Sequence, residues 1–136
     1  MQLKGLAEAA INFGADDDFS QGVAYGLAPD DYRAESNDLA WMIGLEAKLN
    51  NVKAKYAYAR IEGDSVPWFT SDSDFGSAAL RASRSTNVCG HSLGLEYSFS
   101  KNFTLGATVM LTELIEAESG RDQEGTLYQL DMMYKF

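Results

Sequence analysis

The chain has 136 residues, a length typical of one domain, and 46% of them are hydrophobic. No stretch approaches the roughly 20 consecutive apolar residues of a membrane-spanning helix. The chain has 20 acidic and 11 basic residues, a net charge of −9, which disfavours a nucleic-acid surface and general attraction to anionic lipid. The single cysteine, Cys89, excludes an intrachain disulfide. No apolar signal-peptide core follows Met1, as expected of a mature or truncated chain.

Six stretches alternate between apolar and other side chains with the two-residue period of a β-strand. The first is the weakest, and the last has about the length of a tilted membrane strand. A helix over 39–49, capped by Asn37-Asp38, is the rival reading, and 107–117 could also be helical. Gly44 and the Asn50-Asn51 pair disfavour the first helix. The sequence therefore predicts strands near residues 2–13, 38–49, 52–61, 88–100, 103–113 and 126–136.

The connections between these strands alternate in length. Residues 14–37, 62–87 and 113–125 form long polar connections, whereas Asn50-Asn51 and Ser100-Lys101-Asn102 form short turns. In an up-and-down sheet, alternate connections emerge at opposite rims. Membrane barrels have short periplasmic turns and longer extracellular loops. The pattern therefore places every long connection on one rim, and the C-terminus on the short-turn rim.

The apolar face of each strand is predicted to contact lipid. Large apolar and aromatic residues gather at both ends of this face, as in the aromatic girdles of membrane barrels. The opposite face is read as small, polar and charged, which suits water better than a packed core. A soluble β-sheet protein of the lipocalin type, with its ligand inside, is the main alternative for such alternation.

The last strand, Tyr128-Gln-Leu-Asp-Met-Met-Tyr-Lys-Phe136, resembles the terminal strand signal of outer-membrane proteins, with a final aromatic residue and an aromatic two positions earlier. The wider pattern is similar to the C-terminal portion of the putative porin family of Gram-negative outer membranes. Weaker support for this resemblance comes from four further stretches: Lys4-Gly-Leu-Ala-Glu8, Lys55-Tyr-Ala-Tyr-Ala-Arg60, Ser71-Asp-Ser-Asp-Phe75 and Leu93-Gly-Leu-Glu-Tyr97 followed by Lys101-Asn102.

The resemblance and the strand pattern together imply an all-β fold, an antiparallel up-and-down transmembrane β-barrel. Residues 1–136 would supply about six strands of a larger barrel of roughly 16, because six strands are too few to close. Missing N-terminal strands or further copies would complete it. The implied function is passive diffusion of ions and small hydrophilic solutes across the bacterial outer membrane. A structural or adhesive barrel with a plugged lumen is the alternative in the same membrane.

The predicted partners are outer-membrane lipid, lipopolysaccharide and the barrel-assembly machinery. The assembly signal would be carried by Tyr128, Leu130, Met132, Tyr134 and Phe136. Charges on the water-facing side could tune a pore, and the pore-lining candidates are Lys4, Glu8, Glu46, Lys48, Lys53, Lys55, Glu96, Asp131 and Lys135. Any loop that folds inward to narrow the pore is expected outside this chain.

Enzymatic, metal-binding and cofactor-binding functions are not predicted. Cys89 and His91 share a strand face, but two ligands do not make a zinc site. The run Asp16-Asp17-Asp18 lacks the spacing of a calcium loop and reads as a solvated acidic loop, although loose cation bridging to lipopolysaccharide phosphates is a second reading. No nucleophile motif, phosphate loop or catalytic carboxylate pair is present in the sequence.

Overall fold

The fold is a six-stranded antiparallel sheet in the order β1-β2-β3-β4-β5-β6, so every strand pairs only with its neighbours in sequence. The computed structural model describes residues 1–15, 37–67, 74–78, 86–115 and 124–136. A five-residue π-helical turn, η4, is the one helical element in these ranges. The elements are β1 (Gln2–Ile11), β2 (Leu39–Leu49), β3 (Val52–Ile61), η4 (Asp74–Ala78), β4 (Val88–Ser98), β5 (Phe103–Leu114) and β6 (Glu124–Tyr134).

All six predicted strands are confirmed, and the helical reading of 39–49 and 107–117 is wrong. The largest differences lie at strand ends. The first strand stops at Ile11 rather than at residue 13, the fourth at Ser98 rather than at residue 100, and the last runs from Glu124 to Tyr134 rather than from 126 to 136. Phe13 and Phe136 therefore lie just outside the sheet, because no strand partner extends that far.

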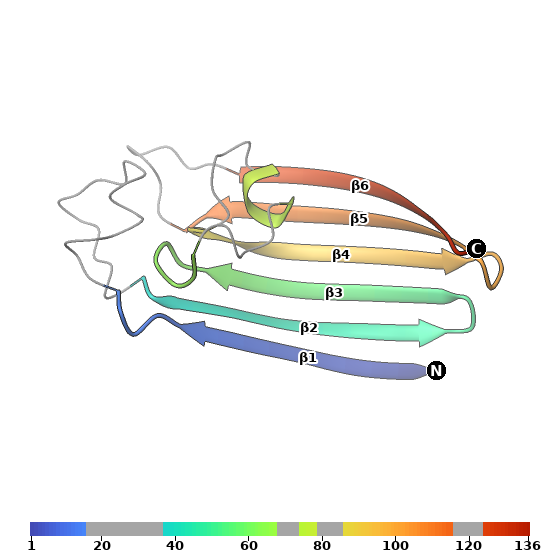
Figure 1. Cartoon of the computed structure of the whole chain (residues 1–136), viewed down its shortest axis with the longest axis horizontal. Helices are drawn as coiled ribbons and strands as arrows, with labels where there is room; N and C mark the ends of the chain where they lie inside the picture. Colours follow the sequence, from blue (N-terminus) through green and yellow to red (C-terminus); the bar gives the residue numbers. More distant parts are fainter. Residues whose placement is uncertain (16–36, 68–73, 79–85, 116–123) are drawn as a thin grey trace.

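The two short turns lie at one end of the sheet, together with both chain termini (Figure 1). In the turn between β2 and β3, Asn50 has a φ of 52°. Asparagine tolerates this left-handed conformation better than most residues, so it suits a tight hairpin. In the turn between β4 and β5, the Ser100 hydroxyl oxygen accepts hydrogen bonds from the backbone N–H groups of Asn102 and Phe103. We call this end of the sheet the turn rim and the opposite end the loop rim.

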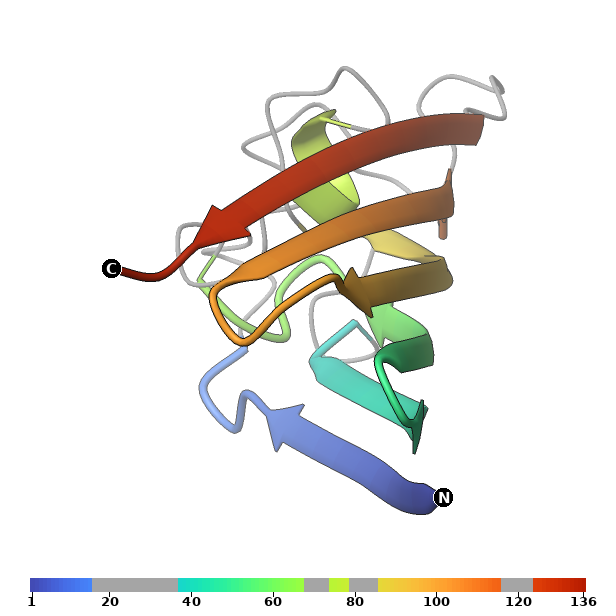
Figure 2. The same cartoon turned by 90° about the vertical axis from the view of Figure 1, so that its right-hand side faces the viewer.

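The sheet does not close on itself. Figure 2 shows the strands following one another along a twisted arc, with β1 and β6 apart at its two ends. In the described part of the chain, β1 pairs only with β2 and β6 only with β5. The outer edges of both strands therefore present unpaired backbone groups. The chain by itself forms an open wall rather than a barrel.

Candidate functional site

The strand register gives the sheet two chemically different faces. Leu45 lies opposite Tyr56, which lies opposite Leu93 on β4, and these side chains share one face. The adjacent row, with Glu46 opposite Lys55, points to the other side. We call the first the outer face and the second the inner face. The predicted assignment of 39–49 and 103–111 to a common apolar face is thereby confirmed.

Exposure to solvent is the reverse of what a soluble sheet shows. Outer-face side chains are exposed although they are large and apolar; Leu130 is 82% exposed and Tyr128 75%. Along β4, from His91 to Ser98, exposed outer positions alternate with half-buried inner ones. A soluble protein normally shields its apolar face and exposes its polar face. On β4 the inner side is the less accessible one, and η4 lies over the loop-rim half of this face (Figures 1 and 2).

The nine predicted pore-lining residues all fall on the inner face. Lys48 lies opposite Lys53, and that row continues through Glu96 to Asp131. Lys4 lies opposite Glu46, which lies opposite Lys55, and Glu8 lies two inner positions nearer the loop rim. Lys135 follows β6 and lines the same hollow as Lys48 and Met133.

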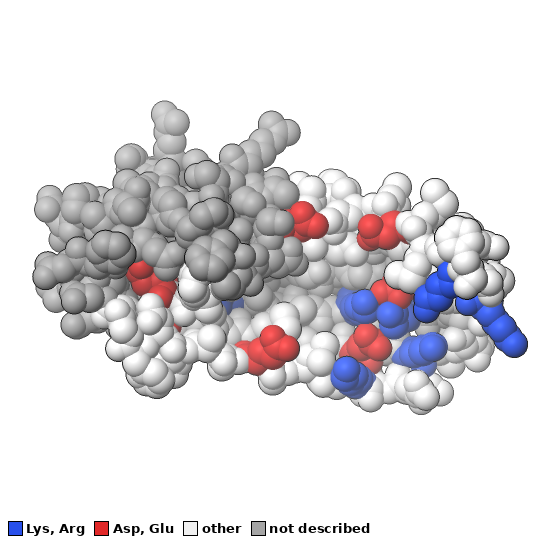
Figure 3. Space-filling view, viewed as in Figure 1, with Lys and Arg blue, Asp and Glu red and all other residues white. Residues whose placement is uncertain are grey.

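Two ion pairs join neighbouring strands in the charged part of this face. The Glu96 carboxylate accepts Lys53 Nζ at 2.5 Å on one oxygen and Lys55 Nζ at 2.6 Å on the other. These side chains are partly exposed, so each pair stabilises the sheet only slightly. Their main effect is to fix the charges in place over β3 and β4. Figure 3 shows lysines gathered toward the turn rim, at the right of the view.

The inner face is not uniformly small and polar, and that prediction is wrong for its loop-rim half. There, Ala59, Phe75, Val88 and Met110 form a buried cluster, and Met42, Ile61 and Leu127 pack against it. Phe75 comes from η4 rather than from a strand. The charged residues are thus concentrated in the turn-rim half, while the loop-rim half carries the small hydrophobic core of the chain.

The segment after β3 is held in place by polar contacts across the strand ends. Buried Glu62 accepts the backbone N–H of Leu39 at 3.1 Å and Arg60 Nε at 3.0 Å. The Asp64 carbonyl accepts the side-chain amide of Asn12 at 2.7 Å. Further along, the Asp74 carboxylate accepts a 2.6 Å hydrogen bond from the side-chain amide of Gln129 on β6. Residues 74–78 are therefore held against the inner face of the sheet, whereas the prediction of a pore-narrowing loop outside this chain stays a prediction.

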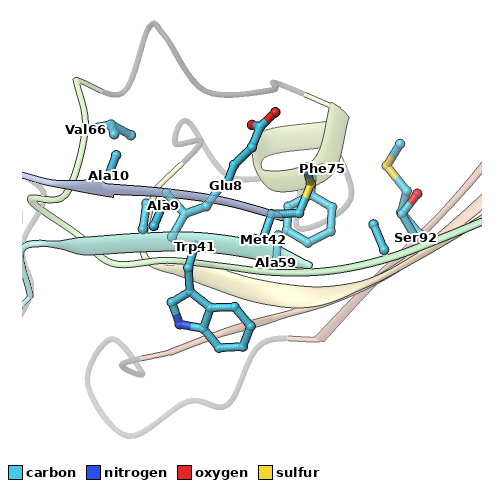
Figure 4. Close-up of a pocket in the computed structure, with 13 residues that line it drawn as sticks. Glu8, Ala9, Ala10, Trp41, Met42, Ala59, Val66, Phe75 and Ser92 are labelled. Carbon is cyan, nitrogen blue, oxygen red and sulfur yellow. The ribbon is translucent and has the colours of Figure 1, made fainter. Parts of the chain in front are cut away.

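A cavity of about 390 Å³ lies between this segment and the sheet. Figure 4 shows Met42 and Phe75 close together, with the Glu8 carboxylate on their side and Trp41 pointing away from them. Small side chains on three strands leave the space open, since Ala10, Ala40, Ala57 and Ala59 line it. Sequence reasoning missed this cavity, although the apolar character of Met42, Ile61 and Met110 on an inner face was a signal for it.

The outer face carries polar contacts near the loop rim. Tyr56 Oη and His91 Nδ1 share a 2.9 Å hydrogen bond, and Cys89 Sγ donates to Glu113 Oε1 at 3.5 Å. His91 also stacks against Tyr56 and meets Tyr58 edge-on. In the ranges that the structure describes, no three metal-ligating side chains come together. The Asp16-Asp17-Asp18 run lies outside the described residues.

The five residues of the predicted assembly signal lie along β6 and just beyond it. Tyr128, Leu130, Met132 and Tyr134 occupy the outer face, each opposite a β5 partner; Tyr134 lies opposite Phe103. Phe136 lies past the end of the strand, and its ring contacts that of Tyr134 with centroids 5.2 Å apart. The signal residues therefore form one continuous apolar stripe that ends at the turn rim.

No known family model, curated protein or solved structure matches this chain. Among the described residues, no helix has the length and apolar character needed to cross a membrane.

Proposed function

We propose that this chain is part of the wall of a porin-like channel in the bacterial outer membrane, through which ions and small hydrophilic solutes diffuse passively. The observation that carries the proposal is the reversed exposure of the two faces. A predominantly apolar outer face, interrupted by His91, is more stable against lipid than against water, because burial of apolar surface contributes about 25 cal/mol per Å². The inner face would then border the aqueous lumen.

The height of the apolar band supports this proposal. On the outer face it runs from the aromatic rings of Phe99, Phe103 and Tyr134 at the turn rim to a charged row of Arg60, Glu113 and Glu124. Ten residue steps separate Phe103 from Glu113 along β5. They span about 34 Å of extended chain, or about 26 Å of depth at a strand tilt of roughly 40°. This matches the ~25 Å apolar band of outer-membrane barrels.

The open edges of β1 and β6 indicate how the wall would be completed. Unpaired backbone groups cost several kcal/mol each in hydrocarbon, so both edges require strand partners. We propose that strands outside this chain, or further copies of it, complete the barrel. A lipocalin-like binding protein would instead place its apolar side chains inside, on the face that here carries five lysines and four carboxylates of the candidate set.

The direct test is fractionation followed by conductance. We expect the protein to be found in the outer-membrane fraction, to require detergent for extraction and to produce stepwise ionic currents in a planar bilayer. Protein unfolded by boiling, added at the same concentration, is the control. A protein that stays monomeric and fully soluble without detergent would contradict the proposal.

A plugged structural barrel is the second candidate, because Phe75 anchors a segment over the inner face. The two candidates differ in conductance alone. Extraction by detergent without any current would favour the plugged barrel, whereas currents that increase when Phe75 is truncated would favour a channel narrowed by this segment.

Assembly provides a separate test of the terminal strand. In the proposed membrane setting, Phe136 lies at the periplasmic rim beside Tyr134 and would be read by the barrel-assembly machinery. We expect Phe136→Asp to reduce the inserted fraction, measured as heat-modifiable mobility on a gel. Asn50→Asp adds the same charge in a short turn at the same rim and should be tolerated. Equal assembly of Phe136→Asp and wild type would reject the proposal that Phe136 is part of an assembly signal.

A further inference from the structure

A second hollow, distinct from the cavity beneath Phe75, lies on the inner face at the turn rim. Its volume is about 450 Å³. It is bounded by both short turns and by the ends of β4, β5 and β6, so it lies where the proposed lumen would open. Its lining residues are mostly polar: Lys48, Asn50, Asn51, Ser98, Ser100, Lys101, Asn102, Thr104, Met133 and Lys135.

The charge of this hollow has one sign. Lys48, Lys101 and Lys135 line it, and none of the lining residues is acidic. The three ion pairs of the described residues involve Lys53, Lys55 and Arg60. Lys48, Lys101 and Lys135 therefore form no ion pair within the described residues. Figure 3 shows the basic groups at this end of the molecule. The chain as a whole carries a net charge of −9, so the hollow is a local exception.

The uncharged side chains of the hollow can also donate hydrogen bonds. Ser100 Oγ already accepts two backbone N–H groups, at 3.2 Å and 3.1 Å, which leaves its hydroxyl hydrogen available to a further acceptor. The hydroxyls of Ser98 and Thr104 are 3.2 Å apart and share one hydrogen, so the other is free to donate. Ammonium and hydroxyl donors around one hollow fit a ligand with several acceptor oxygens.

We propose that this hollow binds an oxyanion, the carboxylate or phosphate group of a small hydrophilic solute, at the turn-rim mouth of the channel. The position of the site in a channel rests on the proposed function, but oxyanion binding itself does not. The inner-face position of Lys48, in the row of Lys53 and Glu96, directs the site toward dissolved solutes rather than lipid headgroups. The effect in the channel is to concentrate anionic solutes at this mouth, as rings of lysine do in anion-selective pores.

The test is equilibrium dialysis of inorganic phosphate, and separately of succinate, against the folded protein in a neutral detergent. We compare wild type with the triple variant Lys48→Gln, Lys101→Gln, Lys135→Gln. Three charge-assisted contacts are lost, so we expect the affinity for both probes to fall at least about tenfold. These residues are exposed and far from the hydrophobic cluster, so the heat-modifiable fold should be retained.

Lys4→Gln is the control for a single charge elsewhere on the inner face. It removes one positive charge from the same face, outside the hollow and opposite Glu46, and should leave phosphate affinity within about twofold of wild type. Equal affinity of wild type and triple variant, or absence of phosphate and succinate binding to wild type, would overturn the proposal. An equal loss in Lys4→Gln would also overturn it, because general charge rather than this site would then hold the anion.

Conductance separates failure of the site from failure of the channel. Phosphate added on the turn-rim side should reduce chloride current through wild type but not through the triple variant. Currents without phosphate binding would overturn the anion site and leave the channel standing. Phosphate binding that depends on the three lysines, in a protein that passes no current, would support the site and reject the channel.

Discussion

The outer and inner faces of this sheet differ in what fills the space beside them. The outer face has nothing packed against its apolar side chains in the described part of the chain, from Leu3 on β1 to Leu130 on β6. The inner face is divided along the strands, with ion pairs near the turn rim and a buried cluster around Phe75 near the loop rim. Alternation in a sequence therefore defines two faces, but the surroundings of each face decide its chemistry.

Gly90, near the loop-rim end of β4, is the described glycine whose backbone lies closest to a neighbouring strand. A Cβ atom on this residue would lie 2.1 Å from the Leu111 carbonyl oxygen, and this oxygen belongs to backbone that cannot move aside. We therefore expect Gly90→Val to have the largest effect of all and to abolish most folded protein. Heat-modifiable mobility measures the folded fraction. A Cβ on Gly5 would meet nothing within 4 Å, so Gly5→Ala is the control, and wild-type folding of Gly90→Val would contradict the packing.

Truncation of Phe75 tests the loop-rim half of the inner face. Its ring is 7% exposed and packs in the inner cluster. Phe75→Ala should lower the free energy of unfolding by about 3–5 kcal/mol if the site cannot collapse, as measured by urea titration. Phe13→Ala removes an equally large ring that is 93% exposed and should change stability little. Similar effects of the two substitutions would show that η4 does not hold to the sheet.

Two single substitutions to arginine at adjacent residues of β5 compare the cost of a charge on the two faces. Val109 points outward and Thr108 inward. Near the middle of a bilayer, an arginine on the lipid face costs about 2–4 kcal/mol, so Val109→Arg should destabilise the protein in lipid by this amount. Thr108→Arg should cost much less, because in the proposed channel the inner face would border water. Unfolding titrations in lipid vesicles measure the loss of stability in each variant. Equal losses would reject the proposal that the outer face contacts lipid and the inner face borders the lumen.

The smallest stability effect is expected in the turn-rim half of the inner face. Glu96→Gln breaks both ion pairs, but the partners are partly exposed, so stability should change by less than about 1 kcal/mol. In the proposed channel, the reversal potential in a salt gradient should shift toward anion selectivity, because Lys53 and Lys55 lose their counter-charge. Asp131→Asn changes the net charge equally at a residue of the same row that forms no ion pair within the described residues. A shift of selectivity in Asp131→Asn but not in Glu96→Gln would contradict the role of these pairs.

Sequence reasoning predicted the strands, their faces and their order because each depends on local periodicity and turn residues. It placed Glu46 and Lys55 on one side and Leu45 and Tyr56 on the other, as the register confirms. It could not place Phe75, because the connection between β3 and β4 has no period and the contact with Met110 joins distant parts of the chain. It also missed the basic hollow, because Lys101 lies in a turn, where alternation assigns no face.

The strict neighbour-to-neighbour order of the strands has a consequence for how such a wall can change over evolutionary time. Because each short turn joins two strands that already pair with each other, a hairpin such as β2–β3 is a self-contained unit of the sheet. Duplicating or deleting one hairpin would leave every remaining strand in its original direction and keep each side chain on its original face. Loss of a single strand would instead reverse all later strands and move their long loops to the wrong rim. The circumference of the wall can therefore change in steps of two strands, which agrees with the even strand numbers of bacterial outer-membrane barrels.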